Sequence, residues 1–155
     1  MSAKGEAGLA KPLWLCNKCG RSFANRNQSH TCRKLELEHH FQGKAPAVRE
    51  LFEQFLAALQ AIGPVAVLPE QSRIAFQTRM SFAQLTPRKT YLVGHLVLAK
   101  STPSAKFTKI QSLSPRNHVH HFRLESPEFL DAEFLVLLAQ AYAVGNQEHL
   151  SAQAA

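Results

Sequence analysis

Residues 91–98 read Tyr-Leu-Val-Gly-His-Leu-Val-Leu, an apolar run that only Gly94 and His95 interrupt. From Val65 onward the side-chain pattern has a period of two, which is typical of strands whose side chains alternate between the faces of a sheet. Prolines at positions 69, 87, 103 and 115 separate the segments. We therefore predict six short strands in meander order, forming an antiparallel sheet, at Val65–Leu68, Arg73–Gln77, Met80–Leu85, Tyr91–Leu98, Phe107–Ile110 and Asn117–Leu124.

Helical patterns flank these strands on both sides. Pro46 suits a first helical turn, and apolar residues then recur at helical spacing until Gly63-Pro64 ends the helix. A second helix is introduced by Ser126-Pro127-Glu128 or by Asp131, and we expect Gly145 to cap it. The order helix, strands, helix predicts an α+β fold with both helices against one face of the sheet, which leaves the other face to a share of the arginines, lysines and histidines.

All three cysteines lie close together near the N-terminus. Cys16-Asn-Lys-Cys19 is followed after ten residues by His30-Thr-Cys32, and three thiolates with one imidazole suit tetrahedral zinc. Gly20 directly after the first pair permits the backbone turn that such a knuckle needs. Four protein ligands leave no open coordination position, so the predicted zinc is structural. An alternative set takes Cys32 as the third ligand and His39 or His40 as the fourth.

These patterns predict a chain of five parts. We expect a disordered tail at 1–12, a zinc-binding finger at 13–33, a linker at 34–45, the α+β domain at 46–146 and a second tail at 147–155. The N-terminal residues contain no apolar signal segment, and no apolar run approaches the roughly 20 residues of a spanning helix. We therefore expect a cytoplasmic protein without a membrane segment.

The net charge of +7 is unevenly distributed along the chain. Residues 71–124 contain nine basic side chains and no carboxylate, whereas residues 125–155 contain five carboxylates and no Lys or Arg. Such a basic stretch must face solvent, the acidic segment or an anionic ligand, and nucleic acid is the obvious candidate. The candidate anion-binding residues are Arg21, Arg26, Arg73, Arg79, Arg88, Lys89, Lys109, Arg116 and Arg123. In the alternative interpretation, acidic residues such as Glu125 and Asp131 neutralise this surface within the fold.

Histidines in the predicted sheet suggest a second kind of site. His95 interrupts an apolar strand, so its ring needs a hydrogen-bond partner or a ligand. His118 and His120 share one strand face and could meet His95 across the sheet, giving a three-imidazole pocket for a small ligand, a metal or acid-base chemistry. The plainer interpretation is that these histidines are structural or solvated, because no nearby carboxylate could orient them.

Signatures of catalysis are otherwise missing from the sequence. It contains no Gly-x-Ser-x-Gly, phosphate-binding loop or dinucleotide glycine pattern. Together with the cysteine motif and the basic stretch, the lack of these motifs favours a zinc-containing, non-catalytic module that binds nucleic acid or another phosphate-bearing partner. A ligand or enzyme site on the histidines is the alternative, and a protein partner remains open.

Several motifs together resemble a bacterial protein family grouped as domain of unknown function 5655. The resemblance rests on the runs Trp14–Phe23, Asn27–Cys32 and His40–Lys44, and it extends through Arg73–Phe76, Ser114–His118 and Ala141-Tyr142. It implies a zinc-knuckle segment ahead of a small α+β domain, with Cys16, Cys19, His30 and Cys32 as ligands, and it implies no activity. A weaker, fold-level likeness to small frataxin-like bacterial domains implies metal or ligand handling by analogy.

Overall fold

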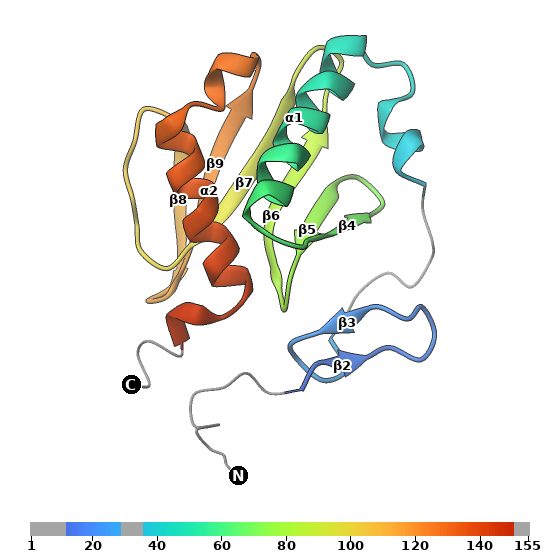
Figure 1. Ribbon diagram of the computed structural model, residues 1–155, viewed down its shortest axis with the longest axis vertical. Coiled ribbons are helices and arrows are strands. Elements are labelled where there is room, and N and C mark those ends of the chain that lie inside the picture. Colours follow the sequence, from blue (N-terminus) through green and yellow to red (C-terminus); the bar gives the residue numbers. More distant parts are fainter. Residues whose placement is uncertain (1–11, 29–35, 151–155) are drawn as a thin grey trace.

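The computed structural model describes residues 12–28 and 36–150. A two-stranded hairpin, β2 (Trp14–Leu15) and β3 (Ser22–Phe23), precedes a larger unit built around one six-stranded sheet. Figure 1 shows two layers in this unit, with both long helices in front of the sheet and the hairpin below β4 and β5. The predicted α+β class, six-stranded antiparallel sheet and C-terminal helix are confirmed.

Every predicted strand is present, although the strand order differs from a meander. The strands are β4 (Ala66–Pro69), β5 (Ile74–Gln77), β6 (Ser81–Pro87), β7 (Leu92–Leu98), β8 (Phe107–Ser114) and β9 (Asn117–Leu124), in the spatial order β4-β5-β6-β7-β9-β8. The meander prediction is therefore wrong for the last two strands, since β9 pairs with both β7 and β8. Val119, Phe122 and Leu124 of β9 are buried, whereas β8 is largely exposed, so burial favours β9 inside the sheet and β8 at its edge.

The core lies between the sheet and the helices. Helix α1 (Pro46–Ile62) has proline in its first turn, as predicted, and buries the apolar stripe Val48, Leu51, Phe52, Phe55 and Leu59. The Phe55 ring centroid lies 5.2 Å from that of Phe76, 6.2 Å from Phe122 and 6.3 Å from Phe134. One aromatic side chain therefore joins α1 to two strands and to α2, and truncating such a residue typically costs about 3–5 kcal/mol.

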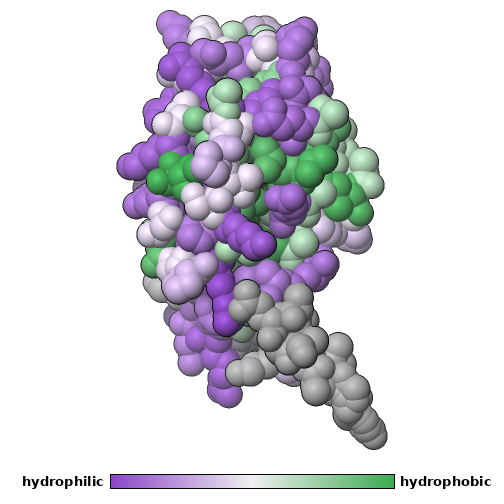
Figure 2. Space-filling model, turned by 90° about the vertical axis from the view of Figure 1, so that its left-hand side faces the viewer, coloured by the Kyte–Doolittle hydropathy of each residue, from purple (hydrophilic) through white to green (hydrophobic). Residues whose placement is uncertain are grey.

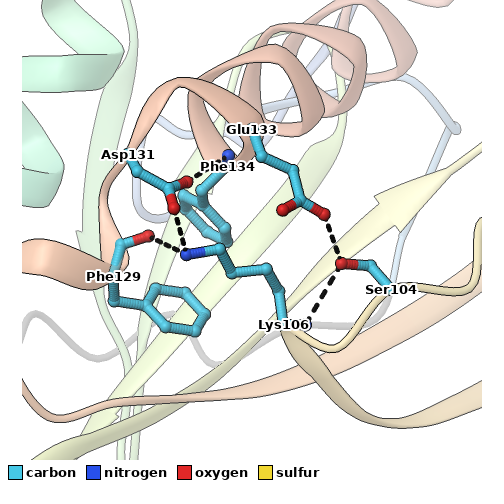
Figure 3. Close-up of polar contacts among 6 residues, drawn as sticks. All are labelled: Ser104, Lys106, Phe129, Asp131, Glu133 and Phe134. Carbon is cyan, nitrogen blue, oxygen red and sulfur yellow. Dashed lines mark hydrogen bonds and ion pairs between the residues drawn. The ribbon is translucent and has the colours of Figure 1, made fainter.

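Polar contacts fix the start of helix α2 (Ala132–Gly145), as Figure 3 shows. Asp131 is the N-cap and accepts a hydrogen bond from the Phe134 amide at 3.0 Å, so of the two predicted starts Asp131 is correct. Lys106 Nζ donates to Asp131 Oδ2 at 2.7 Å and to the Phe129 carbonyl at 3.0 Å. Ser104 Oγ donates to Glu133 at 2.5 Å, so the β7–β8 connection is tied to the helix. At the other end Asn146, rather than Gly145, is the C-cap.

Part of the predicted linker at 34–45 belongs to the folded unit. Residues Leu37–Phe41 form a short 3-10 helix, η1, and Leu37 and Phe41 pack against the core. The guanidinium carbon of Arg49 lies 4.8 Å from the centroid of the Phe41 ring, which holds η1 beside α1. Aromatic packing thus outweighs the polar composition of this segment.

The surface carries both apolar and polar side chains. Figure 2 views the molecule from the β8 side and shows apolar patches among hydrophilic residues. Leu113 of β8 and Leu135 and Val136 of α2 are among the exposed large apolar residues. In the described ranges, no helix combines the length and hydropathy needed to cross a membrane.

Candidate functional site

The first two predicted zinc ligands lie in the turn of the N-terminal hairpin. Trp14 pairs with Phe23 across β2 and β3, and their ring centroids are 5.9 Å apart. Between them the Cys16 amide donates to the Arg21 carbonyl at 2.9 Å, and the Gly20 amide donates to the Cys16 carbonyl at 2.8 Å. Gly20 has a φ of 80°, a conformation that glycine adopts without strain, as the motif predicts. His30 and Cys32 lie outside the described residues.

The alternative ligands His39 and His40 do not join this turn. Within residues 12–28 and 36–150, no three His, Cys, Asp or Glu side chains gather closely enough to hold a metal. His40 is instead buried in η1, where its hydrogen bond to the backbone of Glu70 opposes the lowering of its pKa by burial. The described residues therefore do not bring His39 or His40 together with Cys16 and Cys19, and because Cys32 lies outside them both predicted ligand sets stay predictions.

Polar contacts anchor the hairpin to the end of the sheet. Arg21 forms an ion pair with Glu70 at 3.4 Å, and the Gln77 side-chain amide donates to the Ser22 carbonyl. Glu70 also accepts from Arg73 at 3.2 Å. One carboxylate outside the basic stretch thus forms ion pairs with two of the candidate arginines, and the three groups together keep one positive charge.

The strand register divides the sheet residues between two faces. Leu92, Leu96 and Leu98 of β7 are buried on the face that the helices cover. His95 points the other way, and it pairs with Gln84 of β6 and His121 of β9. We call this second surface, which points away from α1 and α2 and away from the viewer in Figure 1, the outer face. Its central residues are Gln84, Thr86, Val93, His95, Val97, Lys109, Gln111, Val119, His121 and Arg123.

Two imidazole rings meet at the centre of the outer face. The ring centroids of His95 and His121 are 5.6 Å apart, in an edge-to-face arrangement. Burial, followed by the charges of His121 and Arg73, lowers the pKa of His95 to about 4. Burial and the nearby Lys109 also lower the pKa of His121. Burial and the neighbouring positive charge keep the His95 ring neutral near pH 7, because a proton on this ring would be poorly solvated and repelled.

Three of the candidate basic residues surround this pair. Lys109 lies directly opposite His121 in the neighbouring strand and makes no ion pair with another described residue. Arg73 lies close enough to His95 to lower its pKa, although it also pairs with Glu70. Arg123 lies over the ring of Tyr91, with its guanidinium carbon 3.9 Å from the ring centroid, and donates to Glu125 at 2.8 Å. The outer face is thus basic, with partial neutralisation at its margins.

The other candidate basic residues lie away from the centre of the outer face. Arg88 and Lys89 are exposed in the β6–β7 turn, and Arg116 is exposed in the β8–β9 turn. Arg79 donates to Gln147 near the end of α2, and Arg26 is exposed beyond β3. These five side chains border the ends of the sheet and the hairpin, so the structure does not bring all nine candidates together.

The predicted pocket of His95, His118 and His120 does not form. His118 and His120 pair with Leu98 and Leu96, which places them on the opposite face from His95. His120 is buried, accepts a hydrogen bond from the Thr102 amide at 2.9 Å and contacts the Phe107 ring at 4.8 Å. His118 Nδ1 forms a hydrogen bond with Ser112 Oγ at 2.8 Å. These two histidines are structural, which agrees with the plainer interpretation.

The sequence pattern did not identify His121, Tyr91 or Gln111 as residues of the site. His121 is the true partner of His95, and its side chain lies 3.5 Å from Gln111. A period of two places His121 on the face of β9 opposite to His120, but only the pairing register tells which of these faces His95 shares. The available signal was the run His118-Val-His-His121, which offers a histidine to both faces.

The fold and the cysteine hairpin place this chain in a class of small α+β proteins with two helices on one side of an antiparallel sheet. Its residues 37–145 match the family described as Domain of unknown function (DUF5655). The chain belongs to this family, and the cysteine hairpin precedes the matched region. No curated protein and no solved structure matches the chain.

Proposed function

We propose that this protein is a non-catalytic binding module for a phosphate-bearing partner, nucleic acid above all, and that the outer face is its binding surface. The observation that carries the proposal is the gathering of Lys109, Arg73 and Arg123 around the His95–His121 pair. Phosphate contacts by lysine and arginine dominate the affinity of proteins for nucleic acids.

The charge distribution supports an anionic rather than a cationic ligand. The central positions of the outer face contain no carboxylate, and Glu70 and Glu125 pair with arginines at its margins. Lys109 and Arg73 already disfavour a proton on the two imidazoles, and a metal cation would meet the same repulsion. An anion would instead relieve it.

The cysteine hairpin fits a structural zinc ion. Cys16 and Cys19 lie on one tight turn, and thiolates are the donors that zinc prefers at structural sites. His30 and Cys32 would complete the tetrahedron, and the ion would stabilise a segment with few apolar residues of its own. Arg21 and Arg26 would then add positive charge beside the anchored end of the sheet.

A salt titration of nucleic-acid binding tests the proposal. We expect full-length protein to bind a labelled oligonucleotide with an affinity that falls steeply between low and moderate salt. Lys109→Gln combined with Arg123→Gln should reduce the slope of log K against log salt by about 1.5, because each lost phosphate contact contributes about 0.7–0.9. The matched control is Lys44→Gln with Lys100→Gln, which removes the same charge from the segment before α1 and from the β7–β8 connection. Undetectable binding, or equal effects of the two pairs, would refute the proposal.

A ligand or enzyme site built on histidines is the weaker alternative. Its three-ring geometry is absent, and only the His95–His121 pair remains to support it. Inorganic phosphate would be its simplest ligand. A calorimetric titration with phosphate that gives saturable binding, without any affinity for oligonucleotides, would favour this alternative.

A further inference from the structure

We infer that the outer face binds single-stranded nucleic acid in preference to duplex, an inference that rests on the proposed function above. The first reason is shape. The outer face is one side of a sheet whose helices are both on the opposite side, so the described fold offers no helix there to enter a major groove. Sheets with exposed planar side chains instead bind bases that are not paired.

The second reason is a pair of planar surfaces, each formed by one side chain of β9 and one in β7 or directly before it. The Arg123 guanidinium lies 3.9 Å from the Tyr91 ring centroid, and Glu125 fixes it by a 2.8 Å hydrogen bond. The Arg123 side chain is still 48% exposed, so its outer surface is accessible to a base. Guanidinium planes and aromatic rings are the usual stacking surfaces for unpaired bases. The partly exposed ring of His121, edge-to-face with His95, is the second such surface.

The third reason is the spacing of these two surfaces. His121 and Arg123 are two residues apart on one strand face, which corresponds to about 7 Å. Stacked bases in a duplex strand are separated by about 3.4 Å. Successive bases can therefore reach both surfaces only when the strand is extended and unstacked. Lys109, opposite His121 at the sheet edge, is placed to contact the accompanying phosphate.

Competition between two oligonucleotides tests this inference. The probe is a labelled oligothymidylate of about ten nucleotides, a length within the usual site sizes of sheet-based single-strand binders, and the competitor is a duplex of equal length. We expect the single strand to bind at least about tenfold more tightly than the duplex in fluorescence anisotropy. Arg123→Lys keeps the charge but removes the planar group, so it should reduce single-strand affinity about tenfold and reduce duplex affinity much less.

The control and the contrary outcomes separate the two proposals. Arg88→Lys makes the same exchange in the exposed β6–β7 turn and should change neither affinity. Equal binding of single strand and duplex, or unchanged single-strand affinity in Arg123→Lys, would overturn the inference and leave the proposed function intact. If neither oligonucleotide binds, the proposed function fails and this inference fails with it.

Discussion

Acid sensitivity of the folded state should depend on His95. Burial and the charges of His121 and Arg73 lower the pKa of this residue from 6.5 to about 4. Above pH 6.5 the ring is neutral in both the folded and the unfolded chain, so it does not affect stability. Below pH 6.5 the unfolded chain binds a proton that the folded chain rejects until about pH 4, and stability falls over that window.

The size of this effect follows from the pKa difference. One pKa unit corresponds to about 1.4 kcal/mol, so His95 should lower the free energy of unfolding by about 2 kcal/mol between about pH 8 and about pH 5. His95→Gln removes the titrating group, and its stability should fall by about 2 kcal/mol less than that of the wild type over the same pH range.

Urea unfolding followed by far-ultraviolet circular dichroism measures this difference. Wild type and His95→Gln are each unfolded at about pH 8 and at about pH 5. Because each variant is compared with itself at two pH values, any constant effect of the substitution cancels. An acid response of His95→Gln that equals the wild type would refute the burial of His95 beside cationic groups.

Three further predictions concern the fold and the hairpin. Gly94→Ala should destabilise the protein by about 1–3 kcal/mol in urea unfolding, because a Cβ there would lie 2.5 Å from the Gln84 carbonyl and 2.9 Å from Phe122; an unchanged midpoint would contradict this packing. Asp131→Ala should lower the thermal midpoint, since the Phe134 amide and Lys106 both lose their acceptor, whereas Glu128→Ala should leave it unchanged. A chelator should release about one zinc per chain and change the Trp14 fluorescence, while the far-ultraviolet circular dichroism spectrum stays the same. Purified protein that contains no metal would contradict the zinc prediction.

The positions of helices and strands could be predicted because burial sets a local period. Phe52 and Phe55 recur at helical spacing on α1, and the apolar run at 91–98 indicates a central strand. The Asp131 cap and the proline at the start of α1 are likewise local signals. Each of these features depends on residues within a few positions of one another.

Strand order and register could not be predicted in the same way. Whether β8 or β9 pairs with β7 depends on the long β7–β8 connection and on which of the two strands buries more apolar surface. The β8–β9 pairing also shifts register near Phe107 and near Ser114. A shift of one residue exchanges the two faces, and for this reason His121 rather than His120 meets His95.

The charge pattern was informative in part. The carboxylate-free stretch does supply Lys109, Arg73 and Arg123 to the outer face. The alternative interpretation named Glu125, which does pair with Arg123, but counting along the chain did not indicate that Glu70 pairs with Arg73. The alternative of neutralisation within the fold is therefore correct for part of the surface.

The most direct test of the outer face as the binding surface is to map amide chemical shifts during titration with the oligothymidylate. We expect the largest changes at His95, Lys109 and His121, with little change at the exposed Leu135 and Val136 of α2. Changes confined to the helix layer, with the outer face unaffected, would contradict the account.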